Sequence, residues 1–81
     1  MGRKIEHRAL ENSRRRVIHW VSNTIKDHKS SQRVCGEVIG ITQQAMNKRI
    51  RENGTFTLDE VLTIATYYGV PRDELMKEIM P

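Results

Sequence analysis

Apolar residues recur along the chain at the three- and four-residue spacing that places them on one face of an α-helix. The clearest case is the segment 14–27, where Val17, Ile18, Val21 and Ile25 share one stripe. No segment alternates apolar and polar residues convincingly with the period of two that is typical of a strand. The pattern therefore predicts an all-α protein with helices over five segments, at about residues 14–27, 32–39, 43 to 51 or 52, 58–68 and 72–79.

Residues that begin or end helices flank these segments. A side chain that can accept a hydrogen bond precedes each of the first three helices and could cap it. These residues are Ser13, then either Ser30 or Ser31, and Thr42. Residues 57–60 read T-L-D-E, which is the pattern of a capping box before a fourth helix. Glycine tolerates the left-handed conformation at helix ends, so the second and fourth helices are expected to stop at Gly40 and Gly69.

The last two helices carry more apolar residues than one stripe needs. The inner stripe of the fourth helix is expected to comprise Leu58, Val61, Leu62, Ala65 and Tyr68. A second set could form the interface of a homodimer, and loose packing of the last helix would explain it as well. This second set consists of Ile64, Tyr67, Met76, Ile79 and Met80.

The length of 81 residues fits one small domain. A chain this short buries only about 60% of its unfolded surface, so dimerisation would add useful apolar burial. Residues 1–11 are polar and are expected to form either a flexible basic arm or an extension of the first helix. Residues 12–81 are expected to form the folded domain, with Trp20 at the edge of the core or in an interface.

Charge is distributed unevenly along the chain. The net charge is +4, but residues 1–54 carry twelve basic and five acidic side chains, whereas residues 55–81 carry two basic and five acidic ones. A basic surface on the first two-thirds of the chain suits a polyanion such as DNA. A charge excess that only increases solubility is the alternative.

Several classes of function have no support in the sequence. Cys35 is the single cysteine, and His7, His19 and His28 lack the spacing of metal ligands, so neither a disulfide nor a metal site is expected. No motif pairs a nucleophile with a base or cradles a phosphate, so we expect neither an enzyme nor a cofactor or small-molecule substrate. Without a signal peptide or a long apolar segment, we expect a cytoplasmic protein with no membrane partner.

The segment 32–51 has the spacing of a helix-turn-helix motif. The first helix needs a small residue where the second crosses it, and Gly36 is at that position. Gly40 allows the bend of the turn, and Ile41 can fill the space between the helices. Met46 and Ile50 supply the apolar residues that would face inward from the second helix.

The outward face of that second helix is suited to DNA. It carries amides and cations, which are the groups that match base edges, and residues 43–51 contain no acid. An ordinary solvated face is the alternative, although such a face would more usually include Glu. The residues of this face are Gln43, Gln44, Asn47, Lys48 and Arg51.

The stretch G-I-T-Q-Q-A-M-N-K-R-I, residues 40–50, resembles the helix-turn-helix of phage Cro and repressor proteins, and similarity to that superfamily extends over about residues 14–78. The resemblance implies a five-helix bundle of the lambda-repressor-like type, whose third helix enters the major groove. It implies a dimer on a near-palindromic operator in double-stranded DNA, an inverted repeat. Cys35, Gly36 and Arg49 depart from the family pattern, and Arg49 stands where a small or apolar residue is common.

The resemblance also implies roles for individual residues. Base edges would be read by Gln43, Gln44, Asn47 and Lys48, while Gln32 would contact a phosphate and brace the reading helix. We expect the remaining contacts with the DNA backbone from Lys29, Arg33, Thr42, Arg51, Arg14 and Arg15. The last two could equally belong to a solvated helix face.

Together these features predict a sequence-specific transcriptional regulator that occupies an operator, a repressor of phage or prophage origin. The rival hypothesis is a protein-interaction module of the same fold, such as an antitoxin or an anti-repressor, because fold alone does not determine function.

Overall fold

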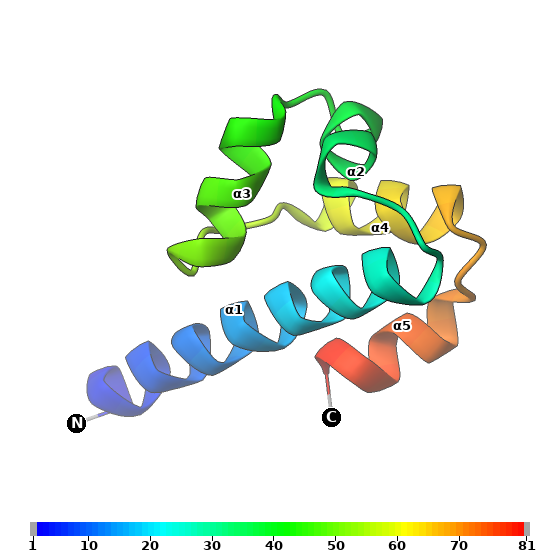
Figure 1. Cartoon of the computed structure of the whole chain (residues 1–81). Coiled ribbons are helices and arrows are strands. Elements are labelled where there is room, and N and C mark those ends of the chain that lie inside the picture. Colours follow the sequence, from blue (N-terminus) through cyan, green and yellow to red (C-terminus); the bar gives the residue numbers. More distant parts are fainter. Residues whose placement is uncertain (1, 81) are drawn as a thin grey trace.

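The computed structural model describes the backbone of residues 2–80 and the side chains of residues 12–80. Within that part of the chain there are five α-helices and no strand, which confirms the prediction of an all-α protein (Figure 1). The helices are α1 (Gly2–Asp27), α2 (Gln32–Val38), α3 (Gln43–Arg51), α4 (Leu58–Tyr67) and α5 (Arg72–Ile79).

Helix α1 begins earlier than the sequence predicted. It runs for 26 residues from Gly2, so Ser13 lies inside the helix and does not cap it. The physical reason is that residues 3–13 contain no proline or glycine and include the strong helix formers Ala9, Leu10 and Glu11. Of the two alternatives for residues 2–11, the backbone shows the helical extension. Met1 lies outside the described residues.

Side-chain caps determine where the next three helices begin. The Ser31 hydroxyl accepts a hydrogen bond from the Val34 N–H at 3.2 Å, and the Thr42 hydroxyl accepts one from the Ala45 N–H at 3.1 Å. Thr57 caps α4, and the Glu60 carboxylate accepts from the Thr57 N–H in return, which completes the predicted capping box. These three caps confirm the helix starts that the sequence predicted.

The core forms where α1 passes between α5 on one side and helices α2, α3 and α4 on the other (Figure 1). Each helix contributes to it, and Val21, Cys35, Met46, Ile64 and Leu75 have no exposed surface. Cys35 is therefore a buried small side chain, as the sequence predicted. The burial of its thiol raises its pKa, although a hydrogen bond with Tyr68 acts in the opposite direction.

The structure corrects three predictions about apolar residues. Leu58 was expected on the inner stripe of α4 but is 62% exposed, because it is the first residue of the helix and lies beyond the elements that cover the stripe. Ile64 and Ile79 were candidates for an interface but are buried in the core. Ile64 is buried because both α1 and α2 pack on α4, so the covered face of α4 is wider than one stripe.

Candidate functional site

Helices α2 and α3 are joined by a tight turn that depends on Gly36. The Gly36 carbonyl accepts a hydrogen bond from the Ile41 N–H at 2.8 Å. A Cβ atom at Gly36 would lie 3.0 Å from the carbonyl oxygen of Ile41 and 3.3 Å from that of Thr42. Both are backbone atoms, so a larger residue would force the two helices apart. Gly36 thus has the role in helix crossing that its sequence position predicted.

The turn itself needs one left-handed residue, and Gly40 provides it with a φ of 78°. Ile41, next in the chain, is half-buried and packs against the core, as expected for a residue that fills the space between α2 and α3. The Met46 side chain is fully buried and Ile50 packs against the core beside it. The inner face of α3 is therefore the one that the sequence predicted.

The opposite face of α3 is open to solvent. All five residues that the sequence assigned to it are exposed: Gln43, Gln44, Asn47, Lys48 and Arg51. Since residues 43–51 contain no acid, nothing within α3 itself neutralises the cations of this face. The face combines exposed amide groups with positive charge on one short, firmly packed helix.

A hydrogen bond ties this face to the start of α2. The Asn47 side-chain amide donates to the Gln32 side-chain oxygen at 3.2 Å. Gln32 is half-buried. The contact therefore holds the side chain of Gln32, which is expected to contact a phosphate, against that of Asn47, which is expected to read a base. The resemblance implied that Gln32 braces the reading helix, and the structure shows that its contact is with Asn47.

Two of the predicted phosphate contacts have acidic neighbours. Arg33 forms an ion pair with Glu37 at 3.0 Å, and Arg51 lies 3.6 Å from Glu52. Exposed pairs of this kind contribute only about 0.2–1 kcal/mol, so a phosphate can compete for either guanidinium. The Thr42 hydroxyl accepts from the Ala45 N–H and still has its own proton to donate.

Lys29 follows the end of α1 in an unusual conformation. Its φ is 51°, in the left-handed region where glycine is normally found. The Ser30 N–H donates to the Ile25 carbonyl at 2.9 Å, which closes the end of the helix around Lys29. The exposed ammonium group is thus held on a fixed turn just before α2.

Arg14 and Arg15 are also exposed, on the part of α1 before its buried stripe. Helix α1 packs against α3, but the structure shows no hydrogen bond or ion pair between either arginine and the described side chains of α3. The basic residues Arg3, Lys4 and Arg8 of the expected arm lie outside the described side chains.

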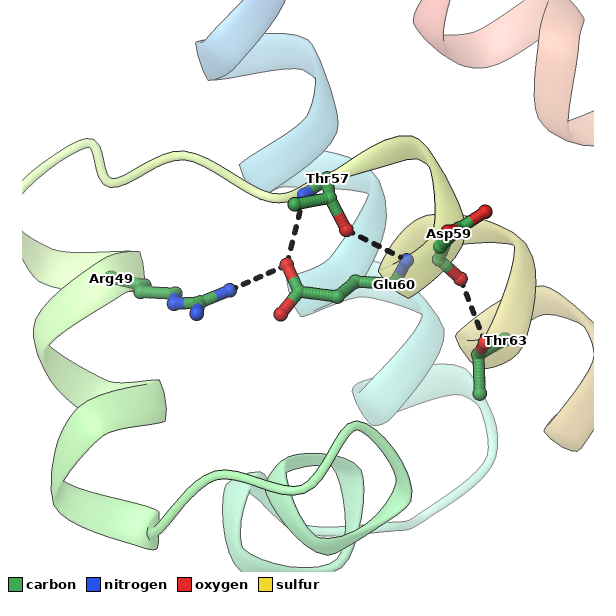
Figure 2. A network of polar contacts seen from close by, with 5 residues as sticks. All are labelled: Arg49, Thr57, Asp59, Glu60 and Thr63. Carbon is green, nitrogen blue, oxygen red and sulfur yellow. Dashed lines mark hydrogen bonds and ion pairs between the residues drawn. The ribbon is translucent and has the colours of Figure 1, made fainter.

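Sequence reasoning missed a network that joins α3 to α4 (Figure 2). An Arg49 guanidinium nitrogen lies 2.7 Å from a Glu60 carboxylate oxygen, the same oxygen that accepts from the Thr57 N–H at 2.8 Å. The guanidinium carbon is 5.3 Å from the centre of the Phe56 ring, a cation–π distance. A Cβ atom at Gly54 would lie 2.7 Å from the Arg49 Cα, so only glycine fits there.

This network explains why an arginine stands at position 49. Burial alone would raise the pKa of the Glu60 carboxyl, but the hydrogen bond from Arg49 and the one from the Thr57 N–H outweigh it, and the pKa is lowered. Arg49 therefore makes its polar contact within the protein, with Glu60. The available signal was an arginine where the family resemblance implies a small or apolar residue, together with the acid of a capping box.

Comparison of the chain with protein-family models, with curated proteins and with solved structures finds no match. Among the described residues, no group of His, Cys, Asp and Glu side chains could hold a metal ion. None of the helices within residues 2–80 has both the length and the apolar character to cross a membrane.

Proposed function

We propose that this protein is a sequence-specific DNA-binding regulator, built as a lambda-repressor-like five-helix bundle in which α2 and α3 form a helix-turn-helix. The observation that carries the proposal is the exposed face of α3, where amides and cations occur together without an acid. Amide and guanidinium or ammonium groups are those that recognise adenine and guanine in the major groove. The proposed mode of action needs no catalysis and no cofactor.

In this proposal Gln43, Gln44, Asn47 and Lys48 read bases. The anchor points on the phosphates are Lys29, Gln32, Arg33, Thr42, Arg51, Arg14 and Arg15. The hydrogen bond between Asn47 and Gln32 supports these roles, because it links a residue proposed to read a base to one proposed to contact a phosphate. Contacts with phosphates set the orientation of α3, and contacts with bases select the sequence.

A regulator of this size would act as a homodimer on an inverted repeat, with half-sites about one helical turn apart. Blocking an operator requires only occupancy, so repression, in a phage or prophage setting, is the simplest mode of action. The protein-interaction module, an antitoxin or anti-repressor, is the rival that the first experiment separates from DNA binding.

That experiment is enrichment of bound duplexes from a random pool at physiological salt, followed by sequencing. Recovery of an inverted repeat would support a dimeric regulator, and a single half-site would support base reading without the dimer. Binding that depends on salt but enriches no sequence would contradict specificity. A complete lack of binding would contradict the proposal and favour the protein-interaction module.

The variant Gln44→Ala tests base reading directly. We expect it to weaken binding to the enriched site by about 1–3 kcal/mol and to change binding to random DNA little, because an amide that reads a base contributes only where that base is present. Affinities for both duplexes, measured at one salt concentration, give the comparison. Equal losses on both duplexes would remove Gln44 from the base-reading set.

A further inference from the structure

A concave surface lies away from the exposed face of α3, on elements other than α2 and α3. It is a groove of about 340 Å³ between the C-terminal part of α1, residues 69–71 and helix α5. Trp20, Thr24, Asp27 and His28 line it from α1, and Glu74 and Glu78 line it from α5. The ring of His28 is held at the groove by a hydrogen bond with the Thr24 carbonyl oxygen at 2.9 Å and by the Tyr68 ring at 5.1 Å.

The groove is acidic in a chain that is basic overall. Asp27, Glu74 and Glu78 bring three carboxylates to it, and no lysine or arginine is among its lining residues, while the net charge of the chain is +4. Three carboxylates on one small surface repel the phosphates of nucleic acids and attract cations. The groove is therefore suited to a basic ligand and unsuited to DNA.

Two nearly buried polar side chains add a second observation. Trp20 is 6% exposed and Thr24 is 5% exposed, and neither side chain makes a hydrogen bond within the described residues. No fully buried side-chain nitrogen or oxygen in that part of the chain lacks a partner. Both residues line the groove, which therefore offers accessible space for a ligand to accept from the indole N–H or to bond with the threonine hydroxyl.

We propose that this groove docks a short basic peptide segment of a partner protein. A lysine or arginine side chain would lie among the carboxylates of Asp27, Glu74 and Glu78, and a main-chain carbonyl oxygen would accept from the indole N–H of Trp20. From Trp20 to Asp27 the α1 axis rises about 10 Å, which matches about three extended residues. Because this site does not use α2 or α3, the inference stands independently of DNA binding.

Trp20 is the one tryptophan of the chain, so its emission reports directly on the groove. The experiment is a titration of the full-length protein, without DNA, with acetyl-Lys-Ala-Arg-amide and separately with acetyl-Glu-Ala-Glu-amide. We expect a saturable change in emission with the basic peptide alone. Salt screens attraction between charges, so raising the ionic strength from about 0.01 to about 0.15 M should weaken binding several-fold.

Matched variants connect the response to the groove. Glu74→Gln with Glu78→Gln should weaken the basic peptide by about fivefold or more, because it removes two of the three carboxylates. Asp59→Asn with Asp73→Asn changes the net charge by the same amount at exposed carboxylates that do not line the groove, and should have little effect. Trp20→Phe removes the indole N–H and should also weaken binding of the basic peptide. Because this variant has no tryptophan emission, its binding is followed by changes in the amide chemical shifts in NMR.

Three outcomes would overturn the proposal: no response to the basic peptide, an equal response to both peptides, or a response that the glutamine variants leave unchanged. A fourth result would also contradict it: if the emission changes with protein concentration alone and sedimentation shows dimers, the groove binds a second copy of this chain and not a partner protein. Thermal unfolding of each variant verifies that it is folded during the titration.

Discussion

The ion pair between Arg49 and Glu60 should contribute measurably to stability, unlike most ion pairs at protein surfaces. Its two side chains are only 28% and 19% exposed, and their nitrogen and oxygen atoms lie 2.7 Å apart. A hydrogen bond with a charged partner contributes about 1.5–3 kcal/mol where solvent is largely excluded, and partial exposure reduces this. We therefore expect a coupling energy of about 1–2 kcal/mol between these two side chains.

A double-mutant cycle isolates that coupling. Arg49→Met keeps an unbranched side chain but also removes the guanidinium near Phe56, a loss that cancels in the cycle if it does not depend on Glu60. Glu60→Gln removes the charge but keeps an oxygen that can accept from the Thr57 N–H. Urea unfolding followed by circular dichroism gives the free energy of unfolding for the four proteins. Since a domain of this length has a total stability of about 4–12 kcal/mol, a coupling of this size is readily resolved.

The chain contains a matched control pair. Arg33 and Glu37 lie 3.0 Å apart, one helical turn from each other, but their side chains are 64% and 62% exposed. The same cycle on Arg33→Met and Glu37→Gln should give only about 0.3–0.5 kcal/mol. Equal coupling energies for the two pairs would mean that burial does not strengthen the pair of Arg49 and Glu60, and that the network does not hold α3 against α4.

Three single variants provide four further tests. Gly36→Ala should lower the urea midpoint, because overpacking against the carbonyl oxygens of Ile41 and Thr42 costs about 1–3 kcal/mol against a gain of at most about 1 kcal/mol in helix propensity; a raised midpoint would contradict this. Lys29→Gly relieves a φ of 51° and should stabilise the fold by up to about 1 kcal/mol. In the proposed DNA complex, the same variant should flatten the salt dependence of binding by about one unit, and an unchanged slope would remove Lys29 from the proposed phosphate contacts. Because the pKa of Glu60 is lowered from 4.5, its contribution to stability is present above that pH and is lost as the pH falls through the lower folded value. Glu60→Gln should therefore lose less stability on acidification than the parent protein, as measured by thermal unfolding from pH 6 to about pH 3.

The ends of α2, α3 and α4 could be predicted because local chemistry determines them. A cap involves a side chain and an N–H three residues later, as at Ser31 and Thr42, so a short stretch of sequence contains both partners. The polar face of α3 follows from helical periodicity in the same way. Its inner residues, Met46 and Ile50, were identified for the same reason.

Features that depend on distant parts of the chain were not predictable in this way. In the sequence, Arg49 stands out only as a departure from the family pattern, and Glu60 only as the acid of a capping box, because the two partners lie eleven residues apart on different helices. The exposure of Leu58 and the burial of Ile64 depend on where other helices pass over α4. The contact between Gln32 and Asn47 likewise required the crossing angle of α2 and α3.

The burial of Cys35 has a consequence for how this protein can be studied. It is the one thiol of the chain, it has no exposed surface, and burial raises its pKa, so the folded protein should resist alkylating reagents. A reagent can modify it only in molecules that have opened, so the labelling rate in plain buffer measures the opened population without any denaturant. Because Cys35 lies in α2, a ligand that binds only the folded protein would slow that chemistry in proportion to its occupancy.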